Sequence, residues 1–187
     1  MSSKTLPSTF PSVCNYDIFL SFRGEDTCKI FTVHLYSALM QAIIHTFQDE
    51  WELPAGGGGG VNISTELHNT INGSKISIVV FLKGYAHSMW CLNELVEILH
   101  CAKIRGQTLL LIFYHVNPSD IRKQTGTFVY AFARHEVLFQ NDMEQVKGWR
   151  AAFREASSRS GWDIKEVANG LRDQIVKEVL SELKPAK

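Results

Sequence analysis

The sequence lacks the long apolar runs and the one-sided charge that would assign it to a membrane or to nucleic acid. No run approaches the roughly 18 apolar residues that a membrane span needs. The N-terminal stretch "MSSKTLPSTFPSVCN" has no apolar segment of the kind found in secretory signals. Because 19 Lys and Arg balance 19 Asp and Glu, no clear nucleic-acid signal and no membrane partner are expected.

Cysteine and histidine are too sparsely arranged for a metal or disulfide framework. The four cysteines, Cys14, Cys28, Cys91 and Cys101, have no CxxC spacing, and the nearby histidines form no zinc pattern. We therefore expect no metal ion. The composition favours a cytoplasmic protein with reduced thiols, and a nuclear location is compatible with it as well.

The familiar catalytic motifs are also missing. The most unusual stretch is "AGGGGG" (55–60), but no lysine and hydroxyl residue follow the glycines, as a phosphate-binding P-loop requires. There is no GxSxG motif. Polyglycine matches the dinucleotide pattern GxGxxG only trivially, and it does not follow the first strand. We therefore look for the chemistry elsewhere.

Apolar strands alternating with helices are what the sequence does contain. Strands are expected at residues 16–22, 43–47, 75–82, 107–116 and 161–164, and helices at 29–42, 64–72, 87–104, 127–139, 144–160 and 166–183. This alternation predicts an α/β fold, a flavodoxin-like doubly wound sheet of five parallel strands flanked by helices. We predict a disordered leader over 1–14, one domain over 15–164, and a C-terminal amphipathic helix or linker over 165–187.

In such a fold, ligands bind at the carboxyl ends of the strands. The polyglycine follows the second strand and so belongs to this rim, rather than to a linker between domains. The helix over 87–104 is expected to bury a stripe made of Leu92, Leu95, Val96 and Leu99.

Glu94 is the leading candidate for chemistry, because it lies early in a helix whose N-terminus faces the rim. Trp90 and Glu97 share its helical face. A carboxylate near a helix N-terminus is stabilised in its ionised form, which suits it to hold a sugar hydroxyl or to steady a developing cation. On spacing alone, a solvated glutamate is the more frequent case. Trp90 is able to stack on a ring, but a Trp at a helix start more often packs.

Further candidates follow the first two strands. Arg23 can bind a phosphate while Gly24 lets the backbone approach it; the alternative is a turn arginine paired with Glu25 or Asp26. Asp49 either accepts hydrogen bonds from a ribose or is a loop charge.

Two residues on helices have simpler interpretations. His34 lies on a mainly apolar helical face with Phe31 and Leu35, which favours a packed or interface histidine over a ligand. Cys91 has no obvious general base in the sequence, so we interpret it as a small core residue.

Seven segments in order resemble the plant branch of the TIR (Toll/interleukin-1 receptor) domain family, as in TIR-type plant immune receptors and TIR-only proteins. They cover about residues 15–160 and read "YDIFLSFRGEDT", "FTVHLYSAL", "TFQDE", "ISIVVF", "GYAHSMWCLNELVEI", "IFYHVNPSDIRKQTGTF" and "WRAAFREAS". The closing "SGWDI…VANG…IVKEVLSELKP" is similar to the segment that joins a TIR domain to a nucleotide-binding domain. The resemblance implies a TIR-only protein or the N-terminal piece of a receptor.

The resemblance also implies an activity. Many members hydrolyse NAD(P)+ at the nicotinamide–ribose bond, giving nicotinamide and ADP-ribose or a cyclic variant as immune signals that trigger cell death. The catalytic glutamate of the family's WCLxEL motif falls on Glu94. Motif matching places Arg23, Gly24, Asp49 and Trp90 at the nucleotide site. NAD+ or NADP+ would be a substrate, and no cofactor is expected.

Self-association is implied as well, because a neighbour's loop completes the site in this family. The helices containing His34 and Trp149 are the implied contact surfaces, and other TIR-containing immune receptors are further partners. The alternative is a non-enzymatic TIR scaffold that signals only through homotypic TIR–TIR interactions.

Three departures from the family pattern bear on the activity. Cys28 replaces a usual Arg, Val33 replaces a usual Ser, and Gly56–Gly60 replace a loop of charged residues. Each glycine adds conformational entropy of order 0.5–1 kcal/mol relative to Ala. We predict weak, assembly-dependent turnover.

Overall fold

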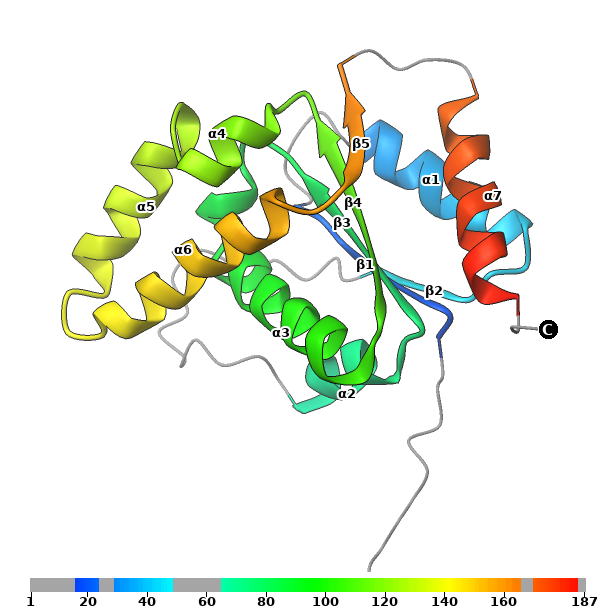
Figure 1. Ribbon diagram of the computed structural model, residues 1–187, viewed down its shortest axis with the longest axis horizontal. Coiled ribbons are helices and arrows are strands. Elements are labelled where there is room, and N and C mark those ends of the chain that lie inside the picture. Colours follow the sequence, from blue (N-terminus) through cyan, green and yellow to red (C-terminus); the bar gives the residue numbers. More distant parts are fainter. Residues whose placement is uncertain (1–15, 24–28, 49–64, 166–169, 185–187) are drawn as a thin grey trace, which may run out of the picture.

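Five parallel strands form one sheet in the order β2-β1-β3-β4-β5 (Figure 1). The computed structural model describes residues 16–23, 29–48, 65–165 and 170–184. The strands are β1 (Ile18–Ser21), β2 (Thr46–Gln48), β3 (Ile76–Phe81), β4 (Thr108–Tyr114) and β5 (Gly161–Ile164). The chain runs outward from β1 to β2 and then returns to β3 on the other side of β1, so the strand order reverses between β1 and β3. This confirms the flavodoxin-like α/β fold.

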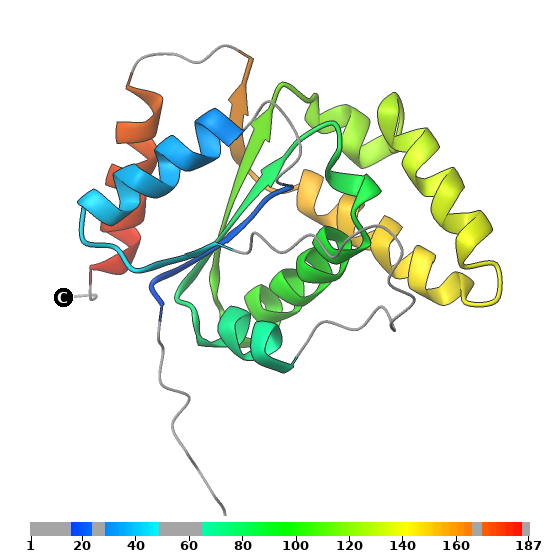
Figure 2. The same cartoon turned by 180° about the vertical axis from the view of Figure 1, so that it is seen from behind.

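Helices cover both faces of the sheet, as Figures 1 and 2 show from opposite sides. The helical elements are α1 (Lys29–Gln41), α2 (Thr65–Gly73), the short 3₁₀ helix η1 (Tyr85–His87), α3 (Met89–Arg105), α4 (Pro118–Lys123), α5 (Thr127–Leu138), α6 (Met143–Ser157) and α7 (Leu171–Leu183). Buried side chains of α1 and α7 pack in one core cluster, and those of α2 to α6 pack in the other.

Side-chain alternation along the strands divides the core into these two clusters. In β3, Val79 and Phe81 face the α3 side, whereas Ile78 and Val80 face the α1 side. In β1, Phe19 faces the α3 side, and Ser21, two residues later, shares that direction. Ser21 is fully buried. A polar side chain therefore occupies a core position at the end of β1.

The buried arc of α3 differs from the expected stripe. Val96 is 40% exposed, so its prediction as a core residue is wrong, whereas Ile98 is fully buried. Glu94 is buried on the same helix. Residues 91, 94, 95, 98 and 99 of α3 are all buried. Compared with the expected stripe, the buried face of the helix is therefore shifted toward Glu94 and away from Val96.

Two other elements differ from the sequence-based expectation. No helix was expected between the strand at 107–116 and the helix at 127–139, but "NPSD" begins α4. The Asn117 side chain accepts a hydrogen bond from Ser119 N at 2.9 Å, and Pro118 takes the first helical position. The second strand begins at Thr46 rather than at residue 43. Ile43 has a φ of 61° and is 84% exposed, so it belongs to the turn after α1.

Helix α7 packs beside α1 (Figure 1). Its Ile175 and Val179 are fully buried in the α1-side cluster. The leader predicted over 1–14 lies outside the described residues.

Candidate functional site

Glu94 lies in the second turn of α3, where the helix approaches the carboxyl edge of the sheet. The helix starts after Ser88, whose Oγ accepts a hydrogen bond from Cys91 N at 3.2 Å. Glu94 is only 2% exposed. This burial excludes the interpretation as a solvated surface glutamate, and a carboxylate buried to this extent requires partners.

Ser21 is the nearest partner of this carboxylate. Its Oγ donates to Glu94 Oε2 at 2.6 Å, which is the length of a hydroxyl–carboxylate hydrogen bond. The Tyr85 hydroxyl lies 3.0 Å from Ser21 Oγ and donates to Cys91 O at 3.1 Å. The end of β1, the turn η1 and the start of α3 therefore meet around one carboxylate.

Tyr85 stays protonated in this setting. Burial raises the pKa of its phenol well above the usual value, and the neighbouring Cys91 and Glu94 raise it further. A neutral phenol keeps its proton for hydrogen bonding. The cluster thus combines one acidic group with two hydroxyls, which suits it to bind or stabilise positive charge rather than to transfer a phenolic proton.

Arg23 extends this junction along the rim. Its NH1 donates to Gly84 O at 2.7 Å, which ties the end of β1 to the turn after β3. Cys91 Sγ lies 3.7 Å from Phe22 O, so the first turn of α3 touches the same segment. Trp90 is half-buried in that turn and packs against the core. The structure therefore brings Arg23, Trp90 and Glu94 to one junction of β1 with α3.

Several predicted residues cannot be placed in this site. Gly24, Asp49, Cys28 and Gly56–Gly60 lie outside the described residues. Their proposed roles at the nucleotide site and in the rim loop stay predictions.

The two residues predicted for self-association have very different exposure. His34 is exposed on α1. Trp149 is fully buried, and its Nε1 donates to Asn93 Oδ1 at 2.9 Å. The prediction for the Trp149 side chain is therefore wrong, because an indole inside the core cannot touch a neighbour. Any contact made by α6 would use exposed side chains such as Lys147 and Arg154.

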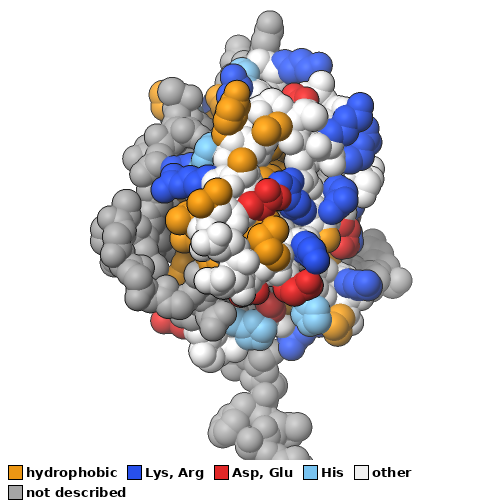
Figure 3. Space-filling view, turned by 90° about the vertical axis from the view of Figure 1, so that its left-hand side faces the viewer, with side chains coloured by type: hydrophobic (Ala, Val, Ile, Leu, Met, Phe, Trp, Pro, Cys, Tyr) orange, Lys and Arg blue, Asp and Glu red, His pale blue; other side chains and the backbone are white. Residues whose placement is uncertain are grey.

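The face that carries α5 is shown in Figure 3, where most Lys and Arg side chains lie toward one side and most apolar side chains toward the other. The exposed apolar residues of α5 include Tyr130 at 75% and Val137 at 71% exposure. Arg150 of α6 forms an ion pair with Glu136 of α5, with 2.6 Å between NH2 and Oε1.

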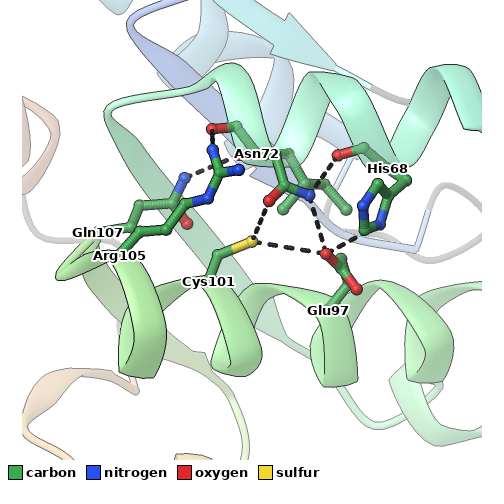
Figure 4. Close-up of polar contacts among 7 residues, drawn as sticks. His68, Asn72, Glu97, Cys101, Arg105 and Gln107 are labelled. Carbon is green, nitrogen blue, oxygen red and sulfur yellow. Dashed lines mark hydrogen bonds and ion pairs between the residues drawn. The ribbon is translucent and has the colours of Figure 1, made fainter. Parts of the chain in front are cut away.

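A second polar cluster joins α2 to α3 (Figure 4). Glu97 Oε1 accepts from Asn72 Nδ2 at 2.9 Å, lies 2.9 Å from His68 Nδ1, and lies 3.6 Å from Cys101 Sγ. Burial and the neighbouring Glu97 raise the pKa of the Cys101 thiol to about 11. Cys101 is therefore a neutral thiol that links helices, not a nucleophile. Cys91 is likewise buried, which confirms its interpretation as a core residue.

Ser21 and Tyr85 were not predicted from the sequence. The sequence did contain a signal for the Ser21 contact, namely a serine within "YDIFLSF", whose other core positions are apolar. A polar residue at a buried position of a strand requires a hydrogen-bond partner, and that partner is Glu94.

Residues 16–23, 29–48, 65–165 and 170–184 contain no group of three or more His, Cys, Asp or Glu that would hold a metal ion. None of the helices in these ranges combines the length and apolar character needed to cross a bilayer.

The strand order and the buried carboxylate beside β1 define a flavodoxin-like α/β domain with its candidate site at the switch point between β1 and β3. A sequence model described as the TIR domain matches residues 15–187, and the chain belongs to the TIR domain family. The family resemblance inferred from the sequence is thereby confirmed.

Similar proteins come from plants. The chain is 45% identical over 184 residues to the disease resistance protein RPV1 of Vitis rotundifolia, an alignment that covers 93% of this chain and 12% of that protein. It is 46% identical over 154 residues to the TMV resistance protein N of Nicotiana glutinosa, covering 82% of this chain and 13% of that protein. The chain thus spans only a small part of the length of these curated relatives.

A solved structure supports the same family. The chain resembles the TIR domains in the structure of the activated Roq1 resistosome directly recognizing the pathogen effector XopQ. The TM-score is 0.76 and the identity 40%, over 90% of this chain and 99% of that chain.

Proposed function

We propose that this TIR domain is an NAD(P)+ glycohydrolase that acts in plant immune signalling and depends on self-association. The observation that carries the proposal is the Glu94 carboxylate, which is 2% exposed and accepts a 2.6 Å hydrogen bond from Ser21 at the switch point of the sheet. The plant disease resistance relatives and the family resemblance of the WCLxEL motif support it.

The chemistry of the bond fits a carboxylate of this kind. Cleavage breaks the bond between the ribose C1′ and the nicotinamide nitrogen, and the electron pair leaves with the ring, which departs as neutral nicotinamide. A general acid is not needed. Positive charge develops on the ribose, and Glu94 would stabilise it until water or another nucleophile adds at C1′. The products are nicotinamide and ADP-ribose, or a cyclic variant when an internal nucleophile adds.

Ser21 and Tyr85 would orient the carboxylate for this task. The serine hydroxyl occupies Oε2 and fixes the plane of the carboxyl group. Arg23 and Trp90 lie at the same junction, where a cation and an indole suit a phosphate and a flat ring. Gly24 and Asp49 would complete the nucleotide contacts.

Burial of Glu94 supports dependence on assembly. A carboxylate with 2% exposure does not reach a ligand in this arrangement, so substrate binding requires the rim to change shape. A neighbouring copy, or another TIR domain, would supply the energy for that change. The similar Roq1 domains belong to a resistosome, which is an assembled state of that protein.

The decisive test compares nicotinamide release by the wild-type chain and by Glu94→Gln, at high protein concentration with NAD+ and, separately, with NADP+. Loss of a charge-stabilising group is expected to lower kcat by about 100-fold or more. Gln keeps the size of the side chain and an acceptor for Ser21. Equal release by both proteins would refute the enzyme.

A non-enzymatic scaffold is the second candidate. It is favoured by the exposed apolar side chains Ile30, at 70%, and Val33, at 49%, which flank His34 on α1 and are suited to a protein contact. If Glu94→Gln assembles and triggers cell death as the wild type does, the scaffold is the function.

A further inference from the structure

Asn93, the residue before Glu94, is bonded to α6 by two side chains. Gln145 Nε2 and Trp149 Nε1 each donate to Asn93 Oδ1 at 2.9 Å. A helical residue points about 100° away from its neighbour, so Asn93 faces α6 while Glu94 faces the sheet. Helix α6 is therefore hydrogen-bonded to α3 at the residue next to the candidate carboxylate.

Of the two donors, Trp149 is the more deeply buried. Its indole is fully buried and packs edge-on against His135, at 5.1 Å, and against Phe139, at 5.2 Å between ring centroids. An indole N–H is a donor only, and in the core its hydrogen bond cannot be exchanged for one to water. The position of Asn93 Oδ1 is thus set by a rigid ring.

A second contact reaches the other side of Glu94. His135 of α5 contacts Ala86 O at 2.7 Å through Nε2, and its ring packs on Trp149. Ala86 belongs to η1 and follows Tyr85, whose hydroxyl contacts Ser21. The packed rings of Trp149 and His135 therefore contact both segments that meet at Glu94. Trp149 bonds to Asn93 of α3, and His135 bonds to Ala86 of η1.

We propose that Asn93 and Trp149, assisted by Gln145, are positioning residues that hold the first two turns of α3 and thereby orient Glu94. This inference rests on the proposed glycohydrolase function and deepens it. None of the three side chains touches the substrate. Their effect arises because a shift of this part of α3 carries the backbone of Glu94, and with it the origin of the carboxylate side chain.

The same arrangement links α6 to the site. A displacement of α6 is transmitted through a buried indole and a 2.9 Å hydrogen bond to the residue adjoining Glu94. Trp149 takes part in this coupling from inside the core rather than as a contact residue.

The first arm of the test is kinetic and uses Trp149→Phe, which removes the N–H donor and keeps an aromatic ring. A misplacement of the carboxylate by about 1 Å is expected to lower kcat on the order of 10- to 100-fold, with less than a roughly 2-fold change in KM. The control is Trp162→Phe, which removes an indole N–H from β5 in the other core cluster and should leave both constants unchanged.

The second arm measures hydrogen exchange and does not depend on activity. In Asn93→Ala, amides of residues 91–95 are expected to exchange at least about 10-fold faster, while those of β4 keep their wild-type rates. Unchanged kcat in Trp149→Phe, or exchange that rises equally in α3 and β4, would overturn the proposal. If the wild type releases no more nicotinamide than Glu94→Gln, the glycohydrolase fails, and the exchange arm alone still decides whether Asn93 holds α3.

Discussion

His135 is a buried titratable residue whose state depends on burial. It is 2% exposed, and its Nε2 lies 2.7 Å from Ala86 O. Because a carbonyl only accepts, Nε2 must carry a proton. Nδ1 is buried and has no hydrogen-bond partner among the described residues. The neutral ring therefore meets its needs with one bond, whereas a protonated ring would leave a buried N–H without an acceptor there.

Burial lowers the pKa of His135 below 6.5, the hydrogen bond to Ala86 O opposes this, and the nearby His87, Arg134 and Arg150 lower it further. As the pH falls below about 6.5, the unfolded chain binds a proton that the folded protein does not. The free energy of unfolding therefore decreases as the pH falls through this window, and it is not affected by this group at higher pH.

We expect His135→Gln to remove part of this pH dependence, because an amide nitrogen near the place of Nε2 can still donate to Ala86 O. Urea unfolding at pH 7.5 and pH 5.5 measures it: the wild type should lose more stability than the variant between the two values. His100→Gln, at an exposed position of α3, is the control and should follow the wild type. Parallel losses in wild type and His135→Gln would contradict the assignment.

At the scale of elements, a set of polar contacts joins α2 to α3 in addition to the apolar packing of Leu67 and Ile71. Asn72 is central to them, since its Nδ2 donates to Glu97 Oε1 at 2.9 Å and its Oδ1 lies 3.4 Å from Cys101 Sγ. Arg105 NH1 also donates to Asn72 O at 3.1 Å. Polar contacts have directional requirements, so they fix the relative position of the two helices more narrowly than apolar packing alone.

Removal of the Asn72 side chain is therefore expected to destabilise the protein. Asn72→Ala removes one acceptor of the buried Cys101 thiol and one donor to the Glu97 carboxylate, and it should lower the free energy of unfolding by about 1–3 kcal/mol. Thr70→Ala is the matched control: Thr70 Oγ1 bonds to Glu66 O within α2, so its loss should cost no more than about 0.5 kcal/mol. Chemical denaturation of both variants measures the difference, and equal losses would show that the link to α3 contributes nothing.

At the scale of the whole molecule, the two sheet faces differ in what they offer a partner. The α1 side carries Ile30, Val33 and Met40 as exposed apolar side chains, with His34 exposed between them. On the other side, α6 buries its large aromatic residues Trp149 and Phe153, whereas α5 exposes Tyr130 and Val137. The α1 side carries the exposed His34, so the predicted role of that residue in association is tested there.

His34→Ala is expected to weaken self-association of the isolated chain several-fold without changing its unfolding midpoint, because an exposed side chain contributes to contacts and little to folding. Sedimentation velocity over a series of concentrations measures this. His100→Ala removes another exposed histidine and should associate like the wild type. Identical association by all three proteins would exclude His34 from the contact surface.

The sequence by itself determined the architecture of this protein. Apolar runs such as "KISIVVFL" are typical of strands buried on both faces, and their alternation with amphipathic helices favours the parallel pairing and the crossovers seen here. The placement of Glu94 near the carboxyl edge follows from the same periodicity. The start of α4 was also predictable, since "NPSD" carries an N-cap residue and a proline at the first helical position, although no helix was expected there.

Only the tertiary structure decided which helical positions turn inward and what each polar side chain bonds to. Glu94 and Val96 are two residues apart, and a small rotation of α3 buries the charged residue and exposes the apolar one. Tryptophan is a residue type often found in protein contacts, yet the Trp149 indole lies in the core and donates a hydrogen bond to Asn93. These outcomes depend on contacts between segments far apart in the chain, such as Ser21 with Glu94, and periodicity along one helix does not specify them.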